Sequence, residues 1–297
     1  MYCDIKDVTI GIAGLGLMGG AIALALNKRC NVPVQQIFAC DLNNETLNTA
    51  KQEGIVGKVW SADNSGEMLG LCDIVFLCLN PSTVLRFLEK WEKSFKTGCL
   101  ITDIAGTKGS IAAAAEKIRN DVDFIPGHPM AGSHVRPGAK GAFINSTSCD
   151  FTGKNYILTP ISRNKKENLD FLKDLIYKLG FSRITEVTAQ EHDRKIAFTS
   201  QLCHVIASSL IDCESDTEIT RFGGGSFEDL TRIAMLNAPM WTELFIENRE
   251  MLLERITQFE KSLDSFKYMI SGTHAEELEK KLSLVRDRRS EMVSAKE

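Results

Sequence analysis

Two side chains in this sequence are of types that could move a proton and hold an anion. His128 lies in the run His128-Pro129-Met130-Ala131-Gly132 after a predicted strand, and an imidazole placed there can act as a general base toward a hydroxyl group. A histidine that only hydrogen-bonds its own loop is the alternative. Arg232 suits bidentate binding of a carboxylate, and Gly225, in the preceding triple glycine, could bring a backbone N–H to the same anion. Taken alone, a surface arginine is the stronger interpretation.

Other polar residues have open interpretations. Ser200 and His204 are four residues apart on a predicted helix, so they share a face and either contact a substrate or bond to each other in the core. His192 could support a catalytic residue, but we favour the interpretation that it is an ordinary residue in the first turn of the same helix. Thr107 precedes a predicted helix and is a plausible N-cap.

A glycine-rich turn near the N-terminus predicts which elements position these side chains. The apolar strand 8–13 leads into Gly14-Leu15-Gly16-Leu17-Met18-Gly19, a small-residue helix follows, and a second strand ends on Asp41. This order and spacing are those of a dinucleotide-binding turn, in which a helix N-terminus faces the pyrophosphate. A carboxylate at Asp41 would bind the ribose hydroxyls and repel a 2′-phosphate, which favours NAD and leaves some NADP use possible. The predicted cofactor contacts in this turn are Gly14, Gly16, Leu17, Met18 and Gly19.

Further apolar runs indicate a parallel sheet that is covered on both faces. Runs at 73–79, 98–102, 124–127 and 156–158 are continuous rather than alternating, as expected for strands buried on both sides. They reach Asn80, Asp103 and His128. Ligands of such sheets bind beyond the carboxyl ends of the strands, so we expect these three residues along one cofactor edge.

The pattern becomes helical after residue 186. Thr188 is predicted to cap a helix that runs to about Asp212, Ser226 to cap a second, and Pro239 to begin a third that continues to about Met269; a last helix covers 274–293. The prediction is therefore an α/β protein. A Rossmann-type, doubly wound domain occupies 1–186, and an all-helical substrate and dimerisation domain occupies 187–297.

Composition limits the function classes. The 297 residues carry a net charge of −4, which argues against nucleic acid or an anionic membrane as the main partner. The apolar segment 10–26 holds five glycines and is too short for a membrane span. The nine cysteines show no metal-binding spacing, so no metal is expected. Scattered cysteines without a disulfide framework also indicate a reducing, cytoplasmic location. Met1 is followed almost at once by the first strand, so no targeting segment is expected.

Together these segments resemble the prephenate/arogenate dehydrogenase family of tyrosine biosynthesis over nearly the whole chain. The resemblance rests on the following motifs: Gly14-x-Gly16-x-x-Gly19, Thr102-Asp103-x-x-Gly106-Thr107-Lys108, His128-Pro129-Met130-Ala131-Gly132, His192-Asp193, Ser200 to His204, Gly223-Gly224-Gly225-x-x-x-Asp229-x-Thr231-Arg232 and Met240-Trp241. It implies a homodimer with an active site between the nucleotide-binding and helical domains.

The resemblance also implies residue roles and a reaction. His128 would bond to the C4 hydroxyl of the substrate ring and act as base, with support from Thr107, and Arg232 would hold the ring carboxylate. Ser200 and His204 would contact the substrate side chain, and Trp241 would line the pocket. The implied reaction is NAD-dependent oxidative decarboxylation of prephenate to 4-hydroxyphenylpyruvate or of arogenate to tyrosine, and the sequence leaves both substrates open.

The chain departs from the family pattern at three positions, and two other functions compete. His134 stands where the family often has glutamate, and Gln201 and Cys203 replace a histidine and a proline. A β-hydroxyacid dehydrogenase has a similar glycine turn, but Lys195 lacks the flanking glycine and asparagine of that family's catalytic lysine. A non-catalytic NAD sensor would need the glycine turn and Asp41, but it would have no use for a base at a strand end.

Overall fold

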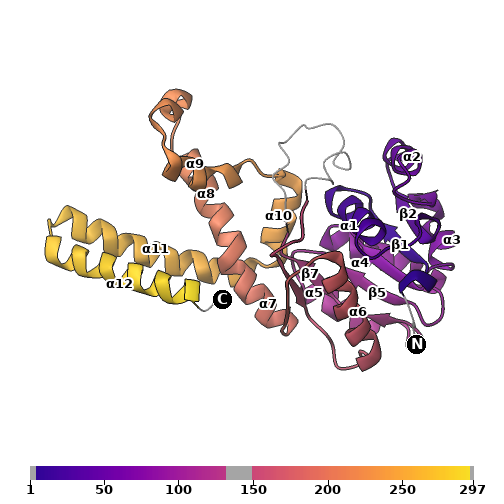
Figure 1. Cartoon of the computed structure of the whole chain (residues 1–297). Helices are drawn as coiled ribbons and strands as arrows, with labels where there is room; N and C mark the ends of the chain where they lie inside the picture. Colours follow the sequence, from indigo (N-terminus) through magenta and orange to yellow (C-terminus); the bar gives the residue numbers. More distant parts are fainter. Residues whose placement is uncertain (1–4, 132–148, 295–297) are drawn as a thin grey trace. The chain divides into compact units, whose positions relative to one another are not determined.

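The computed structural model describes residues 5–131 and 149–294 (Figure 1). The chain divides into two compact units, Met1–Asn248 and Arg249–Glu297. This division differs from the domain boundary expected at residue 186. The expected boundary marks the change from alternating strands and helices to helices alone, and it stays a prediction.

A six-stranded parallel sheet forms the centre of the first unit, in the order β3-β2-β1-β4-β5-β6. This order confirms the predicted doubly wound sheet. The chain leaves β1 first toward β2 and later returns to its other side at β4, so the order reverses between β1 and β4, where ligands of such sheets bind. The strands are β1 (Ile10–Ala13), β2 (Ile37–Asp41), β3 (Lys58–Ser61), β4 (Ile74–Leu77), β5 (Leu100–Asp103) and β6 (Asp123–Phe124).

Helices cover both faces of this sheet, as the continuous apolar runs predict. Alternate residues of one strand enter different cores: Ile74 and Phe76 face one cluster, and Val75 and Leu77 face the other. All four side chains are fully buried. The helices of this part are α1 (Leu17–Lys28), α2 (Asn44–Gln52), α3 (Ser65–Leu69), α4 (Pro81–Trp91), α5 (Gly109–Lys117) and α6 (Lys166–Leu179).

A second sheet contains His128 and corrects one expectation. The run 124–127 is not a single strand that delivers His128 at its end, because β6 stops at Phe124 and a new strand, β7 (Gly127–Pro129), holds His128 in its middle. Pro126 has no N–H to continue the ladder, and its carbonyl accepts a hydrogen bond from Thr159 N instead. β7 pairs antiparallel with β8 (Asn155–Leu158), which pairs parallel with β9 (Arg183–Glu186).

The helical region begins as one continuous rod (Figure 1). It consists of α7 (Ala189–Ile196), a π-helical turn (Ala197–Gln201) and α8 (Leu202–Asp212). Thr188 caps α7 as predicted, because its side chain accepts Glu191 N–H at 3.1 Å.

Two predicted boundaries in the rest of this region are wrong. Gly224, not Ser226, is the N-cap of α9 (Gly225–Thr231). The helix that contains Pro239, α10 (Ala238–Glu247), stops at Asn248 rather than continuing to Met269. Asn248 is the C-cap of α10, and its side-chain amide donates to Asp193 O and to Gln201 Oε1, which holds it in this position.

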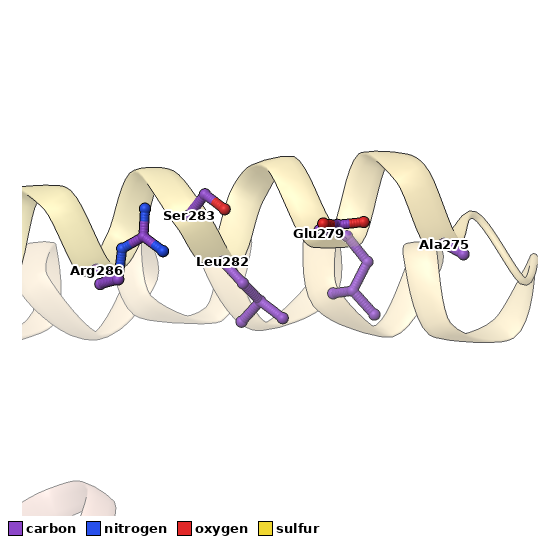
Figure 2. A pocket seen from close by; sticks show the side chains of 6 residues that line it. Ala275, Glu279, Leu282, Ser283 and Arg286 are labelled. Carbon is purple, nitrogen blue, oxygen red and sulfur yellow. The ribbon is translucent and has the colours of Figure 1, made fainter.

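The second unit is a hairpin of two long helices, α11 (Arg249–Ser271) and α12 (Ala275–Ser294). Lys281 Nζ donates to Ser265 Oγ at 2.9 Å across the pair. A shallow surface pocket runs along one side of α12, where Ala275, Leu282 and Arg286 lie (Figure 2). Within the described ranges, no helix combines the length and the apolar character needed to cross a membrane.

Candidate active site

The glycine-rich turn after β1 has the shape that a dinucleotide pyrophosphate requires. Gly14 has φ +94°, and a Cβ there would lie 2.5 Å from the carbonyl oxygen of Cys78. A Cβ on Gly19 would strike the carbonyl oxygen of Gly14, so only glycine lets α1 pack this closely. A Cβ on Gly16, the N-cap of α1, would meet nothing within 4 Å, and no side chain caps this helix. Open space and uncapped N–H groups therefore meet where an anion would bind.

Asp41 ends β2 beside this turn, as expected. Its carboxylate accepts Leu15 N–H at 2.6 Å and Asn43 N–H at 2.8 Å, which fixes the side chain against the glycine turn. A carboxylate has about four acceptor positions, so two hydrogen bonds leave capacity for ribose hydroxyls. The residues present therefore fit a dinucleotide without a 2′-phosphate.

Asn80 and Thr107 follow neighbouring strands at the same edge of the sheet. Asn80 is exposed and is the N-cap of α4, with no capping bond from its side chain. Thr107 is not an N-cap, because Lys108 holds that position before α5. The Thr107 hydroxyl is buried and has no hydrogen-bond partner within the described part of the chain.

Asp103 also lies at this edge, but its side chain turns inward. Asp103 and Lys108 have no exposed side-chain surface, and Lys108 Nζ lies 2.5 Å from Asp103 Oδ2. Asp103 also accepts Ala105 N–H at 2.8 Å and Gly127 N–H at 3.1 Å. These bonds favour a positioning role for Asp103, because they tie the start of β7, and so the backbone next to His128, to the end of β5.

His128 belongs to a chain of three side chains. His128 Nδ1 lies 2.9 Å from His192 Nε2, and His192 Nδ1 lies 2.7 Å from Asp193 Oδ1. The same carboxylate accepts the N–H groups of Lys108 and Gly109, both at 2.8 Å, where α5 begins. The favoured interpretation of His192 as an ordinary first-turn residue is therefore wrong, because its buried ring contacts the candidate base.

Burial sets the protonation of both imidazoles. Desolvation is the main cause that holds the pKa of His128 well below its usual 6.5, and the neighbouring His192 and Lys108 add to it. Desolvation also lowers the pKa of His192, against the opposing effect of Asp193. Both rings are therefore neutral near pH 7, and a neutral imidazole is the form that accepts a proton.

Ser200, His204 and Trp241 form a second group, on the π-helical turn, α8 and α10. The rings of His204 and Trp241 are stacked with centroids 3.6 Å apart. His204 Nδ1 lies 2.9 Å from the backbone oxygen of Ser200. The stack holds the imidazole in one orientation on the helix face that Ser200 shares.

The departures from the family pattern have different structural contexts. Gln201 is buried, donates to Leu244 O at 2.9 Å and accepts from Asn248 Nδ2 at 2.7 Å, so it joins the π-helical turn to the end of α10. Cys203 is exposed on α8. His134 lies outside the described residues.

Arg232 and Gly225 lie further along the helical region. Gly225 is the first residue of α9, and Arg232 begins a short 3-10 turn (Arg232–Ala234) that packs against α8. Both residues are exposed in the single chain. Lys195, the lysine of the competing β-hydroxyacid function, is exposed on α7 and lies outside the bonded chain around His128. In the described residues, no three His, Cys, Asp or Glu side chains are grouped to hold a metal ion.

This fold and the glycine-rich turn define a dinucleotide-dependent dehydrogenase with a helical C-terminal region. A model of the prephenate dehydrogenase nucleotide-binding domain matches residues 22–185, and one of the prephenate dehydrogenase dimerization domain matches residues 188–284. The chain belongs to the prephenate dehydrogenase family.

Individual relatives agree with this assignment. The chain is 33% identical over 277 residues to the prephenate dehydrogenase of Lactococcus lactis, a match that covers 90% of this chain and 73% of the relative. A crystal structure of prephenate dehydrogenase from A. aeolicus with hydroxyphenyl propionate and NAD+ superimposes with a TM-score of 0.83 at 27% identity, over 98% of this chain and 99% of that one. Synechocystis arogenate dehydrogenase gives a TM-score of 0.76 at 26% identity, over 96% and 99%.

Proposed function

We propose that this chain catalyses the NAD-dependent oxidative decarboxylation of prephenate or arogenate. The observation that carries the proposal is the His128 site. A neutral histidine, bonded to a buried imidazole that in turn bonds to a carboxylate, lies on a strand that Asp103 ties to the edge of the dinucleotide-binding sheet. Relatives that resemble the chain over most of its length are named for these reactions.

In the proposed reaction, NAD supplies the hydride acceptor and His128 the base. The C4 hydroxyl of the cyclohexadienol gives its proton to His128 as hydride leaves C4, the ring carboxylate departs as carbon dioxide, and the ring becomes aromatic. General-base help of this kind contributes about 10²–10⁴-fold to the rate. Thr107, whose buried hydroxyl is at the same edge, supports His128.

The helical region supplies substrate recognition in this proposal. Arg232 holds the ring carboxylate with help from backbone N–H groups near Gly225, while Ser200, His204 and Trp241 contact the substrate side chain. The proposal requires the His128 imidazole and the Arg232 guanidinium to face one cavity. Arg232→Ala should therefore raise KM for the substrate.

The deciding experiment is a set of steady-state rates on prephenate and arogenate, each with NAD and NADP. Turnover of at least one substrate with NAD supports the proposal, and the ratio of kcat/KM values identifies the preferred substrate. His128→Asn is the matched control, because it should lower kcat by about 10²–10⁴-fold while NAD binding persists. NAD binding without turnover of either substrate would instead indicate an NAD sensor.

We also propose that the enzyme is a cytoplasmic homodimer. Two helices can bury only the seam between them, and the hairpin leaves large apolar side chains exposed. On α11 and α12 these include Leu253, Leu263, Tyr268, Ile270, Leu282, Leu284 and Met292. A second copy would cover such surfaces. Size-exclusion chromatography with light scattering should give twice the mass of one chain. A monomer at micromolar concentration would contradict the proposed homodimer.

A further inference from the structure

The bonds around His128 fix more than the position of its ring. Both nitrogens of His192 are engaged, Nε2 with His128 Nδ1 at 2.9 Å and Nδ1 with Asp193 Oδ1 at 2.7 Å. The ring of His192 is fully buried. Each hydrogen bond in the series His128–His192–Asp193 needs one donor and one acceptor. A group at its end that can only accept therefore determines where each proton of the series lies.

Asp193 is that group, because a carboxylate has acceptors only. His192 must carry its proton on Nδ1 to donate to Asp193. A neutral imidazole has one N–H, so His192 Nε2 is an acceptor. The bond at 2.9 Å then requires the proton of His128 to be on Nδ1. The remaining nitrogen, His128 Nε2, is left without a proton.

We propose that Asp193 and His192 are positioning residues that hold His128 as the Nδ1–H tautomer, so that Nε2 is the atom that accepts the substrate hydroxyl proton. This inference rests on the proposed function, since it specifies how the base of that reaction is prepared. In the step itself, the hydroxyl O–H bond breaks and an N–H bond forms at Nε2. The hydride leaves the same carbon with both electrons for the oxidised nicotinamide.

The surrounding charges suit this step. Besides His192, the charged groups near His128 among the described residues are Asp193 on α7, Lys108 just before α5, and Asp103 on β5. Lys108 and Asp103 form a buried ion pair, but Lys108 still lowers the pKa of His128. The Asp193 carboxylate acts in the opposite direction through His192, because a negative charge at the end of the hydrogen-bonded chain favours the imidazolium that forms when His128 accepts a proton.

The carboxylate itself is held rigidly enough for this role. The N–H groups of Lys108 and Gly109 bond to different oxygens of Asp193, each at 2.8 Å. The backbone oxygen of Asp193 also accepts from Asn248 Nδ2 at 2.9 Å. The orientation of Asp193 is therefore fixed by α5 and by the end of α10, independently of the two histidines.

Two substitutions at His192 separate tautomer control from simple packing. His192→Phe keeps a buried ring but removes the acceptor, whereas His192→Gln keeps an amide oxygen that can accept from His128 Nδ1–H. We expect His192→Phe to lower kcat at least 10-fold with KM changed less than threefold, and to shift the acid limb of the pH profile of kcat. His192→Gln should lose less activity: its decrease in log kcat should be at most two thirds of the decrease in His192→Phe.

The matched control is His274→Phe, because His274 Nδ1 also lies near a carboxylate, Glu277 Oε1 at 3.7 Å, but in the second unit, just before α12. Its kcat should stay within twofold of wild type. Unchanged kcat in His192→Phe, or equal losses in the Phe and Gln variants with an unmoved pH profile, would overturn the inference. In both cases the wild type still turns over substrate, so the proposed function survives; its own failure is a wild type without turnover.

Nitrogen-15 NMR of the wild-type enzyme tests the inference without any folding risk. Long-range correlations distinguish the two neutral imidazole tautomers, and the spectrum of His128→Asn identifies the signals of His128. The Nδ1–H pattern for His128 at pH 7.5 is the expected result. An Nε2–H pattern would refute tautomer control even if His192→Phe were inactive or failed to fold.

Discussion

Replacing Lys108 with methionine should destabilise this protein far more than the same change at Lys96. Each lysine bonds to a carboxylate that also accepts a backbone N–H: Lys108 to Asp103 at 2.5 Å, and Lys96 to Asp73 at 2.6 Å. The pairs differ in exposure. Both side chains of the first pair have 0% exposed surface, whereas those of Lys96 and Asp73 are 47% and 22% exposed.

Burial decides the size of the effect. Removing one partner of a buried pair costs about 3–5 kcal/mol, because the other charge stays buried without compensation. An exposed pair contributes about 0–1 kcal/mol. In a folding unit of this size each kcal/mol lowers Tm by about 2–4 °C. Lys108→Met should therefore lower Tm by about 6–20 °C, and Lys96→Met by about 4 °C or less.

Urea and thermal unfolding at pH 7.5, followed by circular dichroism, measure both losses. A double variant, Lys108→Met with Asp103→Asn, removes the uncompensated charge and should recover at least half of the loss in unfolding free energy. Equal destabilisation by Lys108→Met and Lys96→Met would show that burial of the pair is not what matters. A double variant no more stable than Lys108→Met would refute the argument from an unpaired carboxylate.

Three further changes test other parts of the structure. Asp41→Asn should reduce the preference for NAD over NADP in kcat/KM by about 10–100-fold, because a charged acceptor of ribose hydroxyls is worth about 1.5–3 kcal/mol; an unchanged ratio would contradict the role of Asp41. Gln201→Leu should lower the unfolding free energy by about 1–3 kcal/mol, since it removes two buried hydrogen bonds, to Leu244 O and from Asn248 Nδ2, whereas Gln258→Leu on α11 should change the unfolding free energy by less than about 0.5 kcal/mol, as is usual for a surface substitution. The unfolding free energy should fall as pH decreases below 6.5, because the unfolded chain then protonates two histidines whose pKa the native state lowers; urea titrations of wild type and His128→Asn should differ in this slope.

The nucleotide-binding half could be predicted because its rules are local. Gly14 and Gly19 are required by the backbone and packing of the turn itself, and Asp41 follows from its place at the end of the next strand. The continuous apolar runs at 73–79 and 98–102 correctly indicated strands buried on both faces of a parallel sheet. The run at 156–158 was misleading, because it forms β8 of the second sheet, where buried and half-buried residues alternate and β7 pairs antiparallel. What failed there was a boundary: Pro126 ends the first sheet two residues before His128, and this moves the histidine into a second sheet.

The partners of His128 could not be predicted because they lie far away in the chain. His192 is 64 residues from His128, and on its own helix it has the features of an ordinary first-turn residue. Lys108, at the start of a helix, is of a type that is normally exposed, and only the tertiary fold buries it against Asp103. The available signal was the combination of a carboxylate at a strand end with a lysine five residues later.

In this arrangement the proposed base, His128, depends on both halves of the sequence. His128 lies in the part that a boundary at residue 186 would assign to the nucleotide-binding domain, whereas His192 and Asp193 lie just beyond it. Asp193 bonds both to the start of α5 and to His192, so the packing of α7 on α5 also sets the orientation of the proposed base, His128. A change that loosens α7 from α5 should therefore impair catalysis while leaving the glycine turn and Asp41 intact, and dinucleotide binding and turnover become separable properties.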